Sequence, residues 1–445
     1  MKKSLFALAA LGAFAGAAQA QSSVTLYGTL DASVGYLGNA GLTAPASNAG
    51  AGISTSGTGP QALGPTNNMQ GVTNAINAGV LNTGNSISFI DGAISTSLWG
   101  MKGSEDLGGG MKANFDLQSD AMTNNGQTHN SGLFRRSAWV GLSAGWGEVK
   151  LGRQPNPLPE ASGTFVPVQG NTVHQVRSVS RSSLGDQFSN AISYTTPTMS
   201  GFKAKALYAM SNTAGEGNNG AIFAANAFLN MGNLDIAAAY NQAWATGTSQ
   251  ALPYSSTNTA AEASPLSSTN PFNGGNAVGY AAGIKYKVTP ALSIGYGFWH
   301  GDGDNGTSIG SIATNANTVG STNGTRAVGQ STYSGNVNLI GVGYQATPTL
   351  LLGLNYAIST LDSTLTNFQA RYSLSKRTTS YFQASMAKNG AGTTNDGLIM
   401  GNFNATSTNS NSTGSTNVYG ATPSAWYGIP NTTQTAFQVG VIHSF

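Results

Sequence analysis

Alternation decides the fold, and it is plainest in the stretch Val24-Thr25-Leu26-Tyr27-Gly28-Thr29-Leu30-Asp31-Ala32-Ser33-Val34. Successive side chains of an extended strand point to opposite faces, so the apolar residues share one face and the polar residues share the other. A strand between lipid and an aqueous lumen shows this pattern, and so does a strand in one layer of a β-sandwich. This stretch alone therefore leaves both folds open.

The same pattern returns along the chain in about sixteen segments, an even number, as expected for a single-chain bacterial outer-membrane barrel. The candidate strands are 23–37, 86–103, 110–121, 132–145, 148–154, 187–197, 200–211, 220–231, 233–244, 276–288, 291–301, 333–346, 349–359, 365–376, 378–388 and 434–445. In an even-stranded meander the first and last strands are antiparallel, so 23–37 can pair with 434–445. That pairing removes both edges of the sheet.

The connections between these strands alternate in length. One set consists of tight turns rich in Gly and Pro, such as Leu107-Gly108-Gly109-Gly110 and Thr289-Pro290. The other set is long and rich in Ser, Thr, Asn and Gly, and comprises 38–85, 245–275, 302–332 and 389–433. Short periplasmic turns alternating with long outer loops are typical of membrane barrels, whereas a soluble sandwich has no reason to sort its loops. Interdomain linkers are the other interpretation of the long segments, but each is flanked by strands rather than by separate cores.

The first twenty residues have the pattern of an export signal. Lys2 and Lys3 precede an apolar run from Leu5 to Ala18 that is too short for a membrane-spanning helix. Ala18-Gln19-Ala20 fits a cleavage site, which predicts a mature chain that begins at Gln21. We therefore expect a signal peptide over 1–20 and a single barrel domain over 21–445.

The composition excludes several classes of function. Removing Lys2 and Lys3 from the 19 basic residues leaves 17 against 16 acidic ones, which gives no basic stripe for nucleic acid. Cysteine is absent, so disulfides and thiolate chemistry are excluded. Only 8% of the residues are charged, where a soluble domain has about 25%. Disorder is the alternative, but the 16 Tyr, 17 Phe and 6 Trp lie mostly in alternating segments, which favours a barrel.

No stretch predicts an enzyme, a cofactor site or a metal site. The string 306–310 fits a nucleophile elbow and 301–306 fits a dinucleotide-binding pattern, but neither has the strand–helix context that its chemistry needs. The four histidines are too dispersed for metal-ligand spacing.

Several motifs, in order from the first strand to the last, resemble the general porins of Gram-negative bacteria, most closely those of Burkholderia, Bordetella and related β-proteobacteria. They are Val24-Thr25-Leu26-Tyr27-Gly28, Trp99-Gly100-Met101-Lys102-Gly103-Ser104-Glu105-Asp106-Leu107-Gly108-Gly109-Gly110, Arg136-Ser137-Ala138-Trp139-Val140-Gly141-Leu142, Leu151-Gly152-Arg153-Gln154, Tyr194-Thr195-Thr196-Pro197 and His443-Ser444-Phe445. The resemblance implies an all-β, sixteen-stranded antiparallel transmembrane barrel, a homotrimer, and a third loop folded into the lumen. It further implies an outer-membrane location among lipid and lipopolysaccharide, with the terminal Phe445 as the signal for the barrel-assembly machinery.

The resemblance also assigns roles to individual residues. The third loop spans about 155–186, and Glu160 within Leu158-Pro159-Glu160-Ala161-Ser162-Gly163 matches the acidic position of the constriction. Arg136 and Arg181 match basic positions on the facing wall, Lys102 matches a basic position beside the conduction path, and Arg177 is a further candidate. Opposite charges across a narrow gap create a transverse field that orders water and solutes.

The alternation of side chains predicts two further lumen-facing residues and a different position for Arg135. Thr29 and Asp31 lie on the polar face of the first strand and are expected to face the lumen. Arg135 is adjacent to Arg136, so in a regular strand it points elsewhere and is expected near the rim.

Three departures from the family leave the sign of the ion selectivity open. Leu98 stands where the family commonly has a lumen arginine, and Ile442 and Ser444 occupy inward positions that are often basic. The function predicted is passive diffusion of ions and small hydrophilic solutes. A substrate-specific channel and a surface adhesin with long outer loops remain as alternatives.

Overall fold

A single antiparallel sheet makes up nearly all of the structure, a computed structural model that describes residues 23–43, 82–126, 128, 132–168, 187–211, 221–244, 276–303, 334–359, 364–388 and 433–445. One helix, α3 (Pro157–Phe165), accompanies the strands. The strands are β1 (Ser23–Thr43), β2 (Asn82–Asp91), β3 (Leu98–Gly108), β4 (Met111–Asp120), β5 (Ser137–Ala144), β6 (Gly147–Pro155), β7 (Gln187–Thr195), β8 (Phe202–Ala209), β9 (Ile222–Met231), β10 (Leu234–Trp244), β11 (Asn276–Lys287), β12 (Leu292–Gly303), β13 (Ser334–Gln345), β14 (Leu350–Ser359), β15 (Thr364–Ser373), β16 (Thr378–Lys388) and β17 (Thr433–Ser444).

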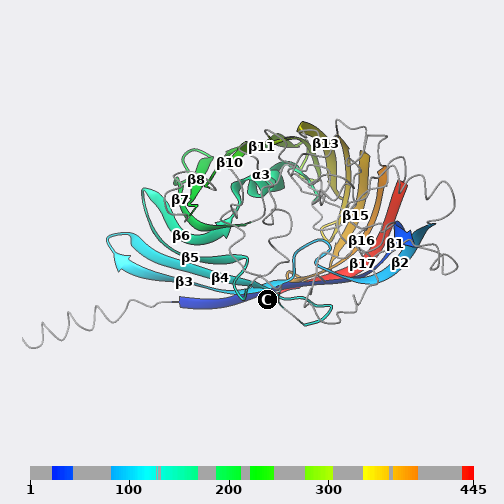
Figure 1. Cartoon of the computed structure of the whole chain (residues 1–445), viewed down its shortest axis with the longest axis horizontal. Coiled ribbons are helices and arrows are strands. Elements are labelled where there is room, and N and C mark those ends of the chain that lie inside the picture. The colour runs from blue at the N-terminus through cyan, green and yellow to red at the C-terminus, as the bar shows by residue number, and fades with distance from the viewer. Residues whose placement is uncertain are drawn as a thin grey trace, which may run out of the picture.

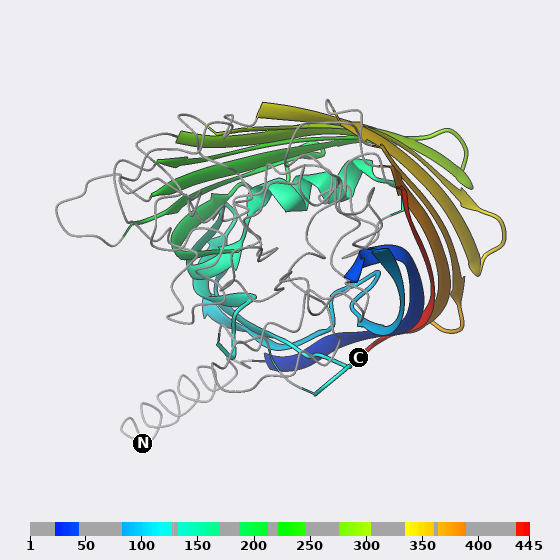
Figure 2. The same ribbon diagram turned by 45° about the vertical axis from the view of Figure 1, so that its right-hand side comes forward.

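The sheet closes on itself. Strands adjacent in sequence pair antiparallel, except that β2 and β3 both pair with β1, and β1 also pairs with β17, with Ala32 opposite Val441. Figures 1 and 2 show the resulting ring of strands, with α3 inside it. The predicted closure of the first strand against the last is confirmed, and with it the sixteen-stranded antiparallel barrel.

Seventeen segments make sixteen barrel strands because β2 and β3 occupy one strand position. β2 pairs with the C-terminal part of β1, where Asp91 lies opposite Ala32. β3 pairs with the N-terminal part of β1, where Leu98 lies opposite Thr29. The sequence predicted one unbroken strand over 86–103, which was wrong at 92–97. Those six residues lie opposite only Leu30 and Asp31, so the strand is interrupted by an insertion that we call the bulge, residues 92–97.

The two faces of the wall differ as alternation requires. Along β17 the side chains of Phe437, Val439 and Val441 are exposed, whereas Gln434 and Gln438, which point to the other face, are buried. Val24, Leu26, Leu30 and Val34 are likewise exposed on β1, while Asp31 and Ser33 are buried. An exposed apolar belt of this extent would cause aggregation in water, whereas lipid solvates it. The apolar residues of the first strand thus face outward, as the sequence predicted.

The short turns are where the sequence placed them. Gly108, Gly109 and Gly110 all have positive φ between β3 and β4, a conformation that glycine adopts without steric cost. Of the predicted long loops, 245–275 lies wholly outside the described residues, and 38–85, 302–332 and 389–433 lie mostly outside them. Among the described helical residues, no helix has both the length and the apolar character needed to span a membrane.

Candidate functional site

The helix α3 follows β6 directly and lies inside the ring of strands (Figure 2). Asn156 caps its N-terminus by accepting a 3.0 Å hydrogen bond from the Leu158 amide, and Pro157 starts the helix where an amide proton is not needed. The sequence predicted a proline-stiffened loop here and gave no sign of a helix. The buried residues of α3 are Pro157, Leu158, Ala161 and Phe165.

The strands beneath α3 and beneath the residues that follow it carry glycines, which allow the inner segment to lie close to the wall. Phe165 packs edge-on against Trp299, with ring centroids 5.0 Å apart, inside an apolar cluster that reaches across β10 to β17. A Cβ atom added at Gly297 would lie 2.5 Å from the Phe165 ring, and one at Gly353 would lie 2.5 Å from Val168 Cβ. These glycines let the segment 165–168 lie directly on the strands. A larger side chain at either position would lift it.

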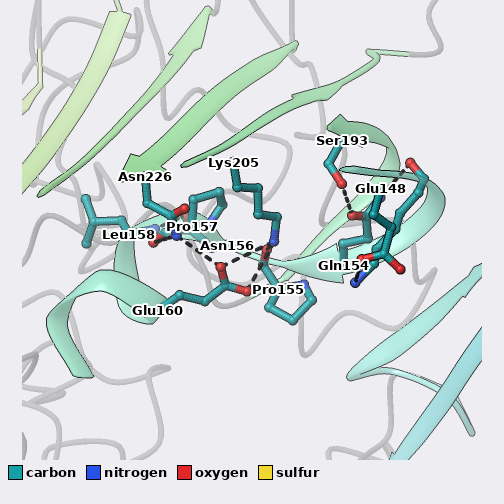
Figure 3. Close-up of polar contacts among 11 residues, drawn as sticks. Glu148, Gln154, Pro155, Asn156, Pro157, Leu158, Glu160, Ser193, Lys205 and Asn226 are labelled. Atoms are coloured by element: carbon teal, nitrogen blue, oxygen red, sulfur yellow. Dashed lines mark hydrogen bonds and ion pairs between the residues drawn. The ribbon is translucent and has the colours of Figure 1, made fainter. Parts of the chain in front are cut away.

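Glu160 is held by the wall on which its own helix is seated. Its Oε1 accepts a 3.1 Å hydrogen bond from Lys205 Nζ, and its Oε2 accepts one of 3.0 Å from Asn226 Nδ2 (Figure 3). Lys205 also donates to the Pro155 carbonyl, and Asn226 donates to the Pro157 carbonyl. The Glu160 side chain is 35% exposed, against 12% for Lys205. The acid is therefore charge-compensated on one side and open to the lumen on the other.

Arg135 and Arg136 share one carboxylate. Arg135 Nε donates to Asp120 Oδ2 at 2.7 Å, and Arg136 Nη1 donates to Asp120 Oδ1 at 3.1 Å. Arg136 Nε also donates to the Gln118 side chain at 3.1 Å. The expectation that one arginine points away from the other assumed a regular strand from residue 132. Because β5 begins only at Ser137, both side chains are able to turn toward Asp120.

Arg153 lies beside this pair. Its Nε donates to the Arg135 carbonyl, and its Nη1 donates to Ser189 at 2.6 Å. Figure 3 shows the neighbouring Gln154, which accepts a 2.5 Å hydrogen bond from Ser193.

Lys102 lies next to β1. Its Nζ is 5.0 Å from the centroid of the Tyr27 ring, and the Tyr27 hydroxyl donates to Asp116 at 2.5 Å. The residue opposite Lys102 on β4 is Asp116 itself. Lys102 thus belongs to a group of polar residues near the β1–β3–β4 wall, apart from Glu160.

Asp31 and Thr29 lie on the inner face of β1. Thr29 Oγ1 is 3.1 Å from Ser444 Oγ across the closing seam. Asp31 is fully buried, and its Oδ2 accepts hydrogen bonds from the amides of Ile94 and Ser95 in the bulge, both at 2.7 Å. Its Oδ1 accepts a 2.6 Å hydrogen bond from the Tyr381 hydroxyl on β16.

The three departures from the resemblance lie around the bulge. Leu98 begins β3 directly after it, and Ile442 packs against an apolar cluster formed by Ile90, Ala93, Ile94 and Tyr381. Ser444 is near Thr29. Apolar packing therefore covers this part of the inner wall, where the resemblance would have placed basic side chains.

The C-terminal residue, Phe445, extends the pairing between β1 and β17. Phe445 exchanges backbone hydrogen bonds with Gly28, at 3.1 and 3.2 Å, and the edge of its ring lies over Gly28. A Cβ atom at position 28 would lie 2.8 Å from Phe445 Cε1 and 2.8 Å from the Leu98 carbonyl oxygen, which explains the glycine there.

The structure joins some predicted residues and separates others. Glu160 contacts Lys205 and Asn226, which the sequence analysis missed, whereas Arg136 and Lys102 have partners of their own. Arg177 and Arg181 lie outside the described residues, as does the predicted cleavage site after Ala20. The sequence contained one signal for Lys205, since Lys203, Lys205 and Leu207 alternate along β8 with the period of an inner face. Within the described ranges, no three acidic or histidine side chains come together as a metal-binding group.

The comparisons with known proteins agree with this architecture. The family model of the Gram-negative porins matches residues 7–320. An outer membrane porin protein of Bordetella pertussis is 33% identical over 206 residues, which is 46% of each chain. Outer membrane porin protein 32 of Delftia acidovorans is 33% identical over 217 residues, 47% of this chain and 50% of its own. The match thus spans about half the length of these relatives.

Solved structures share the fold over nearly the whole chain. An anion-selective porin from Comamonas acidovorans superposes with a TM-score of 0.60 at 21% identity, over 96% of this chain and all of the porin. Salmonella typhi OmpF superposes with a TM-score of 0.52 at 12% identity, over 95% of this chain and 97% of OmpF. With the closed barrel, the inward helix and the match to the family model over most of its length, the chain belongs to the Gram-negative porin family.

Proposed function

We propose that this chain forms a water-filled channel in the outer membrane, through which ions and small hydrophilic solutes diffuse passively. The observation that carries the proposal is the opposite chemistry of the two faces of a closed wall. Exposed apolar side chains cover the outside, and buried amides such as Gln369, Gln383 and Gln438 line the inside. Barrels of 16–18 strands are wide enough to leave an aqueous channel.

The surroundings of the channel form the second part of the proposal. A Gram-negative porin with an apolar outer belt belongs in the outer membrane, where it contacts lipid and lipopolysaccharide. The trimer form of a Vibrio cholerae outer membrane protein, which superposes with a TM-score of 0.50, supports a homotrimer here as well. Export would use the signal peptide over 1–20, and assembly would use Phe445.

Charge selectivity in this channel would come from charged side chains of opposite sign on different parts of the inner surface. Glu160 is the acid exposed on the inward helix, and Arg136 is the base on another part of the wall, with Arg177, Arg181 and Lys102 as further basic candidates. Low-dielectric barrel walls strengthen the fields of such groups. Glu160 favours cations and Arg136 favours anions, so their balance sets the preference.

Planar-bilayer recording of the purified, reconstituted protein tests the proposal. We expect discrete conductance steps, and a complete absence of steps from a folded, heat-resistant barrel would refute it. In a salt gradient, Glu160→Gln should move the reversal potential toward anion preference and Arg136→Ala toward cation preference. If neither variant moves it, the assigned charges do not act on the permeating ions. Block by low concentrations of one solute would instead indicate a substrate-specific channel.

A further inference from the structure

The inner face of β15 carries a basic residue that the sequence analysis did not single out. Asn367 and Gln369 are buried on this face, whereas Phe368 between them is exposed on the outer face. Arg371 follows Gln369 at the next inner position and, unlike it, is only half-buried. The guanidinium group therefore lies on the lumen side of the wall.

A chain of neutral side chains holds Arg371 in place. Its Nε and Nη2 both donate to Gln369 Oε1, at 3.0 and 2.7 Å. Gln369 Nε2 donates in turn to Asn367 Oδ1 at 3.0 Å, and Asn367 Nδ2 donates to Ser385 Oγ at 2.8 Å. Gln369, Asn367 and Ser385 are all buried. These partners fix the guanidinium without cancelling its charge.

An acid lies behind this arginine, on the other side of β16 and β17. Figure 1 shows β15, β16 and β17 leading round the wall to β1. Tyr381 stands opposite Arg371 on β16, and its hydroxyl donates to Asp31 on β1 across Gly440, where a larger residue would clash with the tyrosine ring. The charge of Asp31 acts on Arg371 over this distance. Because Asp31 is fully buried and Arg371 is half-exposed, the lumen meets the positive member of the pair.

The pair at α3 has the opposite orientation. There the Glu160 side chain is 35% exposed and the Lys205 side chain only 12%, so the lumen meets the acid. β10 lies beneath α3, and β15 is the fifth strand from β10 in one direction along the sheet. β5, which directly follows Arg136, is the fifth strand in the other direction. Basic side chains thus flank α3 on both sides of the ring.

Resting on the proposed channel function, we propose that Arg371 is a lumen residue that determines ion selectivity by favouring small anions such as chloride and carboxylates, with Gln369 as its positioning residue. Arg371 lies on β15, two strands from Ile442 on β17. It supplies positive charge close to the region where Leu98, Ile442 and Ser444 replace the basic residues that the resemblance predicts. A charge at the edge of a low-dielectric wall attracts its counter-ions strongly.

Reversing the charge at position 371 tests the selectivity role, and the chain contains no cysteine to interfere. Arg371→Cys channels are recorded in a potassium chloride gradient before and after labelling. Loss of the arginine should move the reversal potential toward cation preference, by up to about fivefold in relative permeability. A positively charged methanethiosulfonate reagent should reverse this shift, and a negatively charged one should increase it. Shifts of the same sign with both reagents, or no shift at all, would overturn the role.

Two further variants separate position from net charge. Arg377→Gln removes the same charge from the exposed turn after β15, so it should shift the reversal potential less than Arg371→Gln. Gln369→Leu keeps the charge but frees the guanidinium to turn toward Asp31, so it should give part of the Arg371→Gln shift. It should add nothing when Arg371 is already replaced. Equal shifts for the two arginines would overturn the role of Arg371, and an additive effect of Gln369→Leu would overturn its positioning role.

The lumen exposure of position 371 can be measured without conductance. The folded protein in detergent carries Arg371→Cys or Gln383→Cys, and mass spectrometry follows the rate of labelling by a hydrophilic reagent. Gln383 lies on the same inner face and is fully buried, so position 371 should be labelled faster. Equal rates would overturn the exposure on which the proposal depends. This result remains informative even if the protein forms no conducting channel.

Discussion

Lys205 Nζ donates to both carboxylate oxygens of Glu160, at 3.1 and 3.3 Å, and thereby ties α3 to β8. The charge of Glu160 is thus partly balanced by a lysine from the strand on its own side of the barrel. A cation that approaches Glu160 from the lumen encounters a carboxylate whose charge is already partly balanced.

Removing Lys205 should therefore increase cation preference. Lys205→Met deletes a positive charge and frees the carboxylate to interact with ions, and one such contact in water at 4 Å is worth about 1 kcal/mol, or roughly a fivefold change in relative permeability. The reversal potential in a salt gradient measures it. Lys203→Met, two residues away on the same strand, is the control. If the two variants give equal reversal potentials, the Glu160 pairing has no effect on permeation.

Because Arg135 and Arg136 share the Asp120 carboxylate, removing the acid and removing an arginine should shift ion selectivity in opposite directions. Asp120→Asn removes the negative charge and one of the two oxygens that Arg135 and Arg136 share, so selectivity should shift toward anions and stability should fall by about 1–3 kcal/mol. Arg136→Ala should shift selectivity the other way. Reversal potentials measure the change in selectivity, and the temperature at which the barrel unfolds, followed on a gel, measures the change in stability. Shifts of the same sign would contradict a shared charge site.

The close approach of Phe165 to Gly297 can be tested by adding one methyl group to the glycine. Gly297→Ala places a Cβ 2.5 Å from Phe165 and 2.6 Å from Trp299, so Phe165 must move, at a cost of about 1–3 kcal/mol. We expect a lower unfolding temperature and greater current noise from the loosened segment. Gly145→Ala is the matched control, because nothing lies within 4 Å of its added Cβ. Equal behaviour of both variants would show that Phe165 does not depend on that gap.

Lys102 is expected to contribute more to permeation than to stability. Lys102→Met removes a cation 5.0 Å from the Tyr27 ring, an exposed contact worth about 0.5–1 kcal/mol. If Lys102 lies beside the conduction path, the reversal potential should move toward cations. Lys112→Met, on β4 beside the turn, should leave it unchanged. No shift in either variant would remove Lys102 from the set of basic candidates.

Variants of Phe445 can show whether this residue acts in assembly in the cell or in the stability of the folded barrel. Phe445→Ala keeps the backbone pairing with Gly28, so the purified variant should refold in detergent nearly as well as the parent chain. Its yield in the outer membrane of cells should fall sharply if Phe445 is the assembly signal. Gly28→Leu, whose Cβ would lie 2.8 Å from Phe445 Cε1, should impair both. Equal losses in cells and in detergent for Phe445→Ala would indicate a purely structural role.

The strands were predictable because their signal is local. Period-two alternation in segments such as 378–388 depends only on which face meets lipid, and the structure has β16 at those residues. Short turns were predictable for a related reason, since Gly108 to Gly110 carry the dihedrals that the turn requires. The interruption at 92–97 was not visible, because its residues continue an extended, weakly polar pattern.

The site was predictable only in part. Alternation placed Asp31 on the inner face, but its partner Tyr381 lies 350 positions away in sequence. Glu160 was found through a resemblance, whereas Lys205 and Asn226 come from other strands and carry no local signal that links them to it. α3 was missed because a nine-residue segment with two prolines has little helix propensity of its own.

By itself, the sequence determined a wall of alternating strands, the side of each strand that faces lipid, and the order in which the strands pair. These follow from interactions between near neighbours and from the chemistry of the surrounding solvent. Only the tertiary structure decided that α3 packs on β9 to β11 and that Asp31 holds the bulge. Closure of the ring is the physical reason, since it brings distant strands together and fixes which inner side chains can meet.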